Sequence, residues 1–320
     1  MSVATTPPIL VAHDVREALA EGHAVVCTES AVVTHGLPRP ENSQIVWRAA
    51  RAARHEGVLS ATVGVIDGKV KVGLSDDDLH RLADPKEETV AKIGVRDLSA
   101  AIVKGLTGGT TVSATAWIAS RIGVRVVCTG GLGGVHRGHH ESLDASSDLV
   151  VLSQAPVAVV CAGPKAVLDL KATMEYLETL AVPVMGLRTE TLPGFYYNDT
   201  EIPLDHAVQD EAEAARIFRA HRALERKGGV VLLNPVPEAQ ALTREEVEPV
   251  IDAAYQKARE EGVLGKAVTP RLLSAVREAL GRRALDVNLA VLESNAAVAA
   301  RLAVSVAREL PDRRPGREGA

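Results

Sequence analysis

Two short apolar runs constrain the fold of this chain more than any other stretch. Residues 124–128 read VRVVC and residues 157–161 read VAVVC, and small residues follow each run. Short runs rich in β-branched residues are typical of strands that are buried on both faces of a parallel sheet. The carboxyl ends of such strands meet at one edge, where open α/β sheets bind their ligands. The sequence therefore predicts a functional site just after these two runs.

The rest of the chain alternates strand-like runs with helical patterns. Asp67 and Gly68 stand between two apolar runs, a strong signal for a β-hairpin, whereas the prolines and the glycine within residues 34–40 indicate a loop. This alternation predicts an α/β fold, namely a three-layer α/β/α sandwich with a mixed, largely parallel sheet. Because no repeat or linker divides the sequence, we expect a single domain over residues 1–310, followed by a disordered tail over residues 311–320.

Composition narrows the classes of function. The formal net charge is -5 and only 2% of the residues are aromatic, which argues against nucleic-acid binding by a basic surface or by base stacking. The first fifteen residues do not combine a basic segment with a long apolar one, so we expect a cytoplasmic protein that does not associate with membranes. The cysteines each lie in an apolar run, which predicts buried, reduced thiols at Cys27, Cys128 and Cys161.

A lysine and a glutamate stand at the ends of two predicted strands. Lys165 follows Cys161 closely, behind small residues that leave its backbone approachable, so it is a candidate amine nucleophile. Glu29 ends the strand that we expect over residues 24–29. Each residue also has an ordinary explanation. Lysine is usually exposed, here in the first turn of a helix predicted over residues 165–180, and an acid at a strand end often pairs with a nearby base.

The segment between the two apolar runs carries further polar residues. Its glycines lack the spacing of a dinucleotide-binding loop, and Lys165 precedes Ala166 where a phosphate-binding loop needs a hydroxyl. The ordinary interpretation of its histidines is that they lie in a solvated loop. Asp144 and Asp148 suit a hard divalent ion that keeps most of its waters, or alternatively they cap helices.

Blocks of sequence along the chain together resemble one enzyme family. They include VVCTESAVVTHGLPRPEN, KIGVRDL, GGTTVSAT, TGGLGGVHRG, LDASSDL, VAVVCAGPK and NLAVLESNAAVAARLA, and they follow one another between about residues 9 and 305. These blocks are similar to the signature blocks of the pseudouridine-5'-phosphate glycosidases. The resemblance implies an α/β/α sandwich, a homotrimer, and reversible cleavage of the C–C glycosidic bond of pseudouridine 5'-phosphate to uracil and ribose 5-phosphate.

The resemblance also implies roles for individual residues. Lys165 matches the lysine that attacks the anomeric carbon of the sugar, and Glu29 matches the proton donor. Asp144 matches the aspartate that binds a divalent metal, expected to be Mn2+. The positions that match substrate-binding residues are Lys92 near the sugar phosphate, Val112, His136 facing the base, Ser146, Ser147, Asp148, and Asn288 near the sugar.

The implied reaction is difficult because the leaving atom is carbon. Enzymes that cleave O- or N-glycosides can protonate a lone pair on the leaving atom, and this ring carbon has none. A lysine avoids the difficulty. If Glu29 assists opening of the ribose ring, Lys165 can form an iminium at C1 that accepts electrons while the ring carbon is protonated. The attack needs an uncharged amine, which burial or the nearby charge of Lys92 would favour.

Several positions depart from the common pattern of the family. Ala31 and Ala166 stand where hydroxyl residues are usual beside Glu29 and Lys165, and Leu187 with its neighbour Arg188 replaces a usual tyrosine. Loss of hydroxyls removes hydrogen bonds that a polar uracil would need. An alternative function is therefore a C-glycosynthase that joins ribose 5-phosphate to an aromatic, polyketide-type aglycone in natural-product biosynthesis. A non-catalytic sensor of sugar phosphates is a third hypothesis, although binding alone needs no nucleophile.

Overall fold

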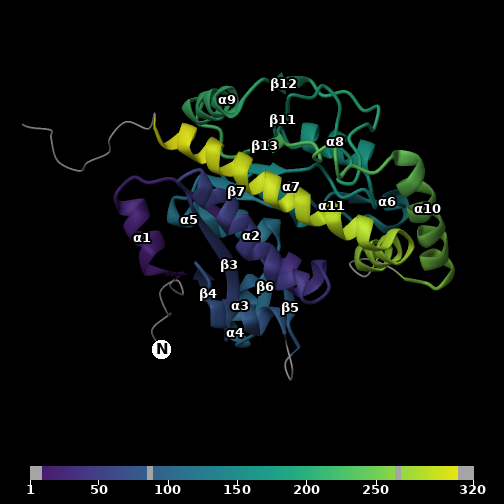
Figure 1. Cartoon of the computed structure of the whole chain (residues 1–320), viewed down its shortest axis with the longest axis horizontal. Coiled ribbons are helices and arrows are strands. Elements are labelled where there is room, and N and C mark those ends of the chain that lie inside the picture. Colours follow the sequence, from purple (N-terminus) through teal and green to yellow (C-terminus); the bar gives the residue numbers. More distant parts are fainter. Residues whose placement is uncertain (1–8, 85–88, 264–267, 309–320) are drawn as a thin grey trace, which may run out of the picture.

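One mixed sheet organises the computed structural model, which describes residues 9–84, 89–263 and 268–308 (Figure 1). Within these residues, the eleven-stranded sheet has the order β1-β4-β3-β2-β7-β9-β13-β11-β12, and β6 pairs with both β3 and β5. Pairing is antiparallel where β3 meets β4 and β6, and parallel between the other described neighbours. The strands are β1 (Leu10–Val11), β2 (Val25–Thr28), β3 (Leu59–Ile66), β4 (Lys69–Val72), β5 (Ala91–Ile93), β6 (Gly108–Thr110), β7 (Val126–Cys128), β9 (Ala158–Cys161), β11 (Val184–Leu187), β12 (His206–Val208) and β13 (Val230–Leu233).

Helices cover both faces of this sheet. One face packs against α1, α5, α7 and α8, and the other packs against α2, α9 and α11. The described helices are α1 (His13–Ala20), α2 (Glu41–His55), α3 (Asp76–Ala83), α4 (Leu98–Val103), α5 (Val112–Ile122), α6 (His139–Ser142), α7 (Ser147–Leu152), α8 (Leu170–Thr179), α9 (Glu211–Ala223), α10 (Arg244–Glu260) and α11 (Val268–Ala307), with short turns η1 (Val32–Gly36) and η2 (Val95–Asp97). The predicted α/β/α sandwich with a mixed, largely parallel sheet is confirmed.

Alternation along the central strands explains why both faces are apolar. In β2, Val25 and Cys27 pack under α1 and α5, whereas Val26 points to the opposite face, under α2 and α11. Successive side chains of a strand point to opposite faces, so a sheet covered on both sides needs continuous apolar runs. The cysteines predicted to be buried thiols are buried and free, and burial raises the pKa of Cys27 and Cys161 to about 12.

Two expectations about local structure need correction. Residues 34–36 belong to the π-helical turn η1 and not to a loop, and only the segment beyond Gly36 is irregular. Lys165 does not begin a helix, because a loop and the short strand β10 (Leu168–Asp169), which pairs with β8 (Val135–His136), precede α8. Backbone hydrogen bonds to the preceding glycine-rich segment, described below, hold this stretch in a non-helical conformation. The predicted tail over 311–320 lies outside the described residues.

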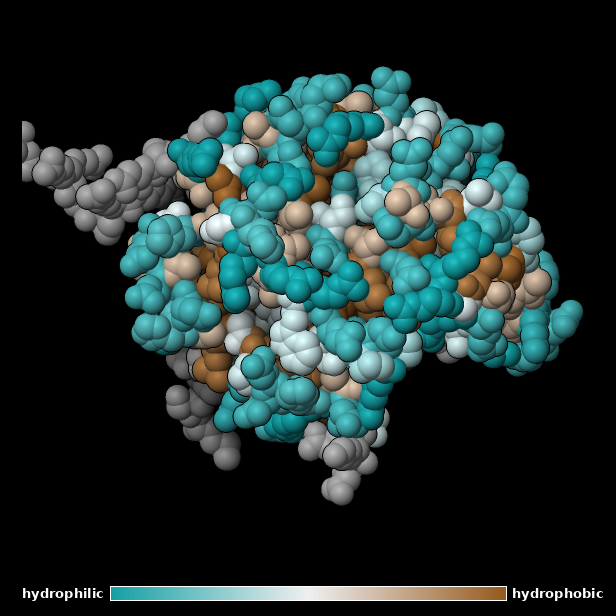
Figure 2. All heavy atoms as spheres, in the orientation of Figure 1, coloured by the Kyte–Doolittle hydropathy of each residue, from teal (hydrophilic) through white to brown (hydrophobic). Residues whose placement is uncertain are grey.

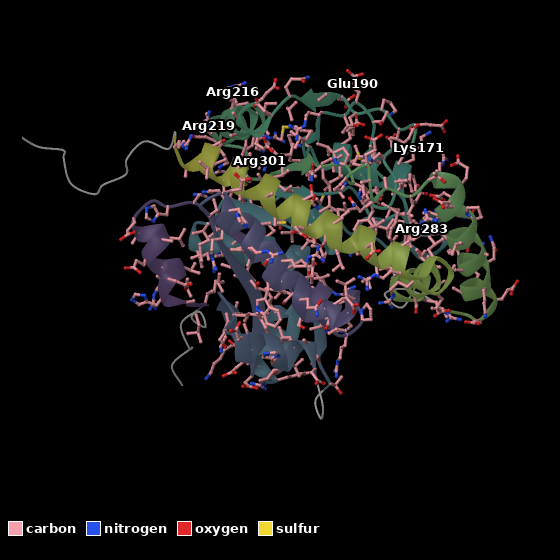
Figure 3. The ribbon with its side chains drawn as sticks, in the orientation of Figure 1. Lys171, Glu190, Arg216, Arg219, Arg283 and Arg301 are labelled. Atoms are coloured by element: carbon pink, nitrogen blue, oxygen red, sulfur yellow. The ribbon has the colours of Figure 1, made fainter. Side chains whose placement is uncertain are left out.

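The helix α11, which is kinked at the non-helical residue Gly281, crosses the sheet beside α2 and α9 (Figure 1). Its residues Arg271–Ala307 are apolar and long enough to cross a membrane, yet 61% of the most apolar window is buried inside the molecule, as expected of a core helix. Figure 2 shows mostly hydrophilic side chains on this face, with smaller hydrophobic patches between them. Arg301, which lies on α11 (Figure 3), donates to Glu56 after α2 at 2.9 Å and to Glu211 of α9 at 2.7 Å. A single guanidinium thus joins three helices.

Candidate active site

Three neighbouring parallel strands bring the two candidate catalytic residues to one edge of the sheet. β2 ends at Thr28 and delivers Glu29, whereas β9 ends at Cys161 and leads into the loop of Lys165. β7 lies between them and pairs in parallel with both strands. Because their carboxyl ends share one edge, Glu29 and Lys165, which are 136 positions apart in the sequence, both lie at that edge.

The charge of Lys165 acts on the Glu29 carboxyl. Burial raises the pKa of Glu29, and this effect is opposed by Lys165, by the Val32 and Ala31 amides, and by Lys92. The Val32 amide donates to Glu29 Oε2 at 3.0 Å. A desolvated carboxyl with a raised pKa can hold a proton for transfer, and two nearby cations can stabilise its anion afterwards.

A backbone ladder fixes the loop of Lys165. The Ala162 amide donates to the Gly130 carbonyl at 2.9 Å, and the Lys165 amide donates to the Leu132 carbonyl at 3.1 Å. Gly163 adopts a positive φ of 95°, and a β-carbon there would collide with the Pro193 carbonyl. Lys165 is partly buried on this loop.

His136 and Lys92 border the same site. His136 is partly buried, and its pKa is lowered first by burial and then by the charges of Lys92 and Lys165, while Asp144 raises it. Lys92 lies on β5, is exposed, and is close enough to influence both Glu29 and His136. The two lysines therefore lie beside a carboxyl and an imidazole, an arrangement that can accept an anionic group.

Asp148 connects two loops of the site through its carboxylate, and we call this pair of hydrogen bonds the Asp148 brace. Asp148 is 5% exposed, and its two oxygens accept from the Ser113 amide at 2.8 Å and from the Gly133 amide at 2.9 Å. One of these bonds agrees with the alternative prediction that Asp148 caps a helix, because Ser113 belongs to the first turn of α5. Ser147 Oγ lies 3.1 Å from Ser113 Oγ, and Ser146 Oγ accepts from the Asp148 amide at the start of α7.

Val112 and Asn288 approach from two other elements. Val112 is the buried first residue of α5, beside the Asp148 brace. Asn288 of α11 donates to the Tyr196 hydroxyl at 3.3 Å and to the Ala284 carbonyl at 2.7 Å. Tyr196 is fully buried, and sequence reasoning overlooked it as a support for Asn288. Its place in a glycine-containing aromatic segment was the available signal.

The predicted metal ligand, Asp144, has one uncommitted oxygen. Asp144 Oδ2 is buried, lies 3.4 Å from His136 Nδ1 and accepts no hydrogen bond from the described residues. Across residues 9–84, 89–263 and 268–308, no three His, Cys, Asp or Glu side chains gather as a closed metal site. A single carboxylate oxygen fits a hard divalent ion that keeps most of its waters and does not fit a tightly caged one.

Two cavities lie near these residues without coinciding with the whole site. One of about 20 Å³ adjoins Glu29 and is walled mainly by apolar side chains, including Val32, Ile45 and Leu292. Another of about 270 Å³ is lined by Arg137, Tyr197 and Glu248 among others, and it includes neither Glu29 nor Lys165. The candidate active site therefore lies where the side chains described above converge, and the larger cavity lies outside it.

Comparison with known proteins identifies the family. A family model described as indigoidine synthase A like protein matches residues 14–305. The pseudouridine-5'-phosphate glycosidase of Myxococcus xanthus is 46% identical over 295 residues, which cover 92% of this chain and 97% of that protein. The protein of the same name from Caldanaerobacter subterraneus subsp. tengcongensis is 42% identical over 296 residues, covering 92% and 96%.

Two solved structures have the same fold. The prealnumycin C-glycosynthase AlnA, in complex with ribulose 5-phosphate, has a TM-score of 0.87 and 34% identity, covering 95% of this chain and 98% of that chain. An indigoidine synthase A-like protein from Thermotoga maritima has a TM-score of 0.85 and 32% identity, covering 96% and 100%. These likenesses weigh against a non-catalytic sensor. The chain belongs to the indigoidine synthase A-like family, together with the pseudouridine-5'-phosphate glycosidases, and it is an enzyme of their carbon–carbon glycosidase class.

Proposed function

We propose that this enzyme reversibly cleaves the C–C glycosidic bond of pseudouridine 5'-phosphate, giving uracil and ribose 5-phosphate. The observation that carries the proposal is the position of Glu29 and Lys165 at the carboxyl ends of β2 and β9, which flank β7, with Lys92 of β5 near enough to act on the same carboxyl. Relatives at 42–46% identity are named pseudouridine-5'-phosphate glycosidases, which supports the same substrate.

The proposed reaction begins with ring opening. The uncharged Lys165 amine bonds to C1 of the ribose, while Glu29 gives its proton to the ring oxygen as the bond from that oxygen to C1 breaks. The Glu29 carboxylate then takes a proton from the new ammonium at C1, which restores the nitrogen lone pair, and gives this proton to the uracil ring carbon, so that the bond between C1 and that carbon can break. The lone pair of the lysine nitrogen forms the C=N bond of an iminium, and the bonding pair of the broken bond returns to the uracil ring. Water hydrolyses the iminium, releasing ribose 5-phosphate and the free amine.

The remaining residues hold the substrate in this scheme. Lys92 pairs with the phosphate, and the first turn of α5 at Val112, together with Ser146 and Ser147, positions the sugar phosphate. His136 faces the base and Asn288 the sugar. Asp148 keeps the loops that carry these contacts at a fixed separation through its two backbone hydrogen bonds.

We also propose a divalent metal, Mn2+, at Asp144. Its buried Oδ2 would hold the ion, and the remaining coordination positions would be waters. When bound, the ion would neutralise negative charge near the sugar phosphate. The family resemblance further suggests a homotrimer, and the sequence itself favours a cytoplasmic protein with one domain over residues 1–310.

A second candidate function is C-glycoside synthesis with an aromatic aglycone. AlnA, a C-glycosynthase, is similar over 95% of this chain. Ala31 and Ala166 also remove two hydroxyl groups beside the catalytic pair, which favours a less polar aglycone. The chemistry is the same in reverse, since an electron-rich aromatic carbon attacks the iminium to form the new bond.

Borohydride trapping tests the shared mechanism. The enzyme incubated with ribose 5-phosphate and borohydride should gain the mass of the reduced sugar adduct at Lys165, and Lys165→Ala should not. Lys171→Ala is the matched control, because Lys171 is an exposed lysine of α8 (Figure 3) and should leave trapping unchanged. An unmodified Lys165 in the wild-type protein would contradict the mechanism.

A synthesis assay separates the two candidate functions. Uracil added to enzyme and ribose 5-phosphate should yield pseudouridine 5'-phosphate. An adduct at Lys165 without any pseudouridine 5'-phosphate would instead favour the synthase with an aromatic aglycone.

A further inference from the structure

Ser30, which directly follows Glu29, has a completely buried side chain committed to two strands. Its hydroxyl donates to the Val63 carbonyl on β3 at 2.5 Å and accepts from the Thr110 amide at 3.0 Å. The Ser30 amide also donates to the Thr110 carbonyl at 3.2 Å. One serine therefore makes a two-way connection to Thr110, at the end of β6.

This connection reaches the element that carries Lys92. In the parallel pairing of β5 with β6, Lys92 lies opposite Gly109, the neighbour of Thr110. β6 itself is paired to β3 only through Gly64 with Gly109 and Val65 with Gly108 among the described residues. Because this ladder is short, β6 and β5 depend on additional bonds. The Thr110 hydroxyl donates to the Val63 carbonyl at 2.7 Å, and the Ser30 hydroxyl bridges the Thr110 amide to the same carbonyl group.

The close approach of the two segments is built into the chain at Gly109. A β-carbon there would lie 2.6 Å from the Ser30 carbonyl oxygen and 2.5 Å from Thr34 Oγ1. Only glycine permits this separation. The turn after Glu29 therefore lies directly against β6, in which Gly109 pairs with Lys92 of β5.

We propose that Ser30 is a positioning residue that sets the separation between the Glu29 carboxyl and the Lys92 ammonium. This proposal rests on the proposed function, in which Glu29 transfers the proton and Lys92 pairs with the phosphate. Both hydrogen bonds of the Ser30 hydroxyl join it to the backbone of β3 and β6. It acts by holding β6, and through it β5, against the turn that begins at Glu29.

An electrostatic consequence makes the proposal measurable. The charge of Lys92 lowers the pKa of Glu29, against the stronger effect of burial. If β5 moves away when the hydroxyl is removed, this attraction weakens with distance and the pKa of Glu29 rises. A purely structural role would reduce stability without moving the titration of Glu29.

The test compares Ser30→Ala and Ser30→Cys with a matched control, Thr200→Val. Thr200 is also buried, donates to the Leu192 carbonyl at 2.7 Å and accepts from the Ile202 amide at 3.3 Å, and it has no part in the site. Carbon-13 NMR of protein labelled at the glutamate carboxyls reports the titration, and the signal missing from Glu29→Gln identifies Glu29. Steady-state cleavage of pseudouridine 5'-phosphate gives kcat/KM.

We expect Ser30→Ala to raise the titration midpoint of Glu29 and to lower kcat/KM by about 10- to 100-fold, the loss that a displacement near 1 Å causes. Ser30→Cys keeps the shape but bonds weakly, so it should change both quantities in the same direction by less. Thr200→Val should change neither. Cysteine also provides the decisive measurement if the alanine variant does not fold.

Unchanged Glu29 titration and kcat/KM in Ser30→Ala, or in Ser30→Cys if only that variant folds, would overturn the proposal, whatever the loss of stability. The NMR titration does not depend on the reaction. If Lys165 is never trapped, the proposed function fails while the titration still decides whether Ser30 sets the surroundings of Glu29.

Discussion

Replacing Asp148 by asparagine should reveal how strongly the brace beneath the site stabilises the fold. Each carboxylate oxygen accepts one buried backbone N–H, from Ser113 at 2.8 Å and from Gly133 at 2.9 Å. Asparagine keeps one acceptor oxygen and turns a donor NH2 toward the other amide. Losing one charge-assisted hydrogen bond and stranding one N–H should lower the free energy of unfolding by about 2–4 kcal/mol. Asp148→Ala strands both amides and should cost more.

Urea unfolding followed by circular dichroism measures this difference, with Asp210→Asn as the control. Asp210 Oδ1 accepts from the Glu213 amide at 2.8 Å at the start of α9, and asparagine caps a helix equally well. The control should therefore change the free energy of unfolding by less than about 0.5 kcal/mol. Borohydride trapping of Lys165 should also slow in Asp148→Asn, since both braced loops shift. Equal stability of Asp148→Asn and the wild type would refute the account of the brace.

Three further substitutions test other contacts. Glu29→Gln should stabilise the fold near pH 8 and make no difference near pH 4. The reason is that burial raises the pKa of Glu29 in the folded protein, so the wild type loses stability as pH rises and the carboxyl ionises. Melting temperatures at both pH values check this, and a difference that does not depend on pH would contradict it. Gly163→Ala should abolish trapping of Lys165, because the β-carbon of alanine would collide with the Pro193 carbonyl and residue 163 has a positive φ. Trapping of this variant at the wild-type level would show that the loop geometry is not required. Arg301→Met should lower the free energy of unfolding by about 1 kcal/mol in urea titrations, because two carboxylates lose a partly exposed partner. Arg283→Met (Figure 3) should have a smaller effect, because it removes a single exposed pair, and equal effects would show that joining two carboxylates adds nothing.

The sequence predicted the layers better than it predicted local conformation. Valine-rich runs ending at Cys128 and Cys161 are buried on both faces, and this pattern alone indicates neighbouring parallel strands. Lys165 was expected in the first turn of a helix because its downstream residues form helices well. The ladder from Gly130 and Leu132 to the Lys165 loop overrides that propensity, and such long-range backbone pairing leaves no periodic trace in a sequence.

The supporting residues of the site were the least predictable part. Glu29 and Lys165 could be proposed because strand ends are visible in the sequence and because the family resemblance names their positions. Ser30 could not, because its importance lies in a buried partner, Thr110, contributed by a distant element. Tyr196 stood out only as part of an aromatic segment, and its contact with Asn288 leaves no mark in the sequence. Asp148 was predicted as a substrate-binding residue, a role that its two backbone bonds neither require nor oppose.

The position of α11 in the chain has a consequence for synthesis on the ribosome. This helix follows every strand of the described chain, yet it covers one face of β2, β7 and β9. Until it emerges, the nascent sheet presents Val26, Val126 and Val160 to water and to other chains, for a time on the order of tens of seconds at usual rates of translation. Chaperones that hold nascent polypeptides would therefore find their binding surface on that uncovered face, and completed chains should no longer need them.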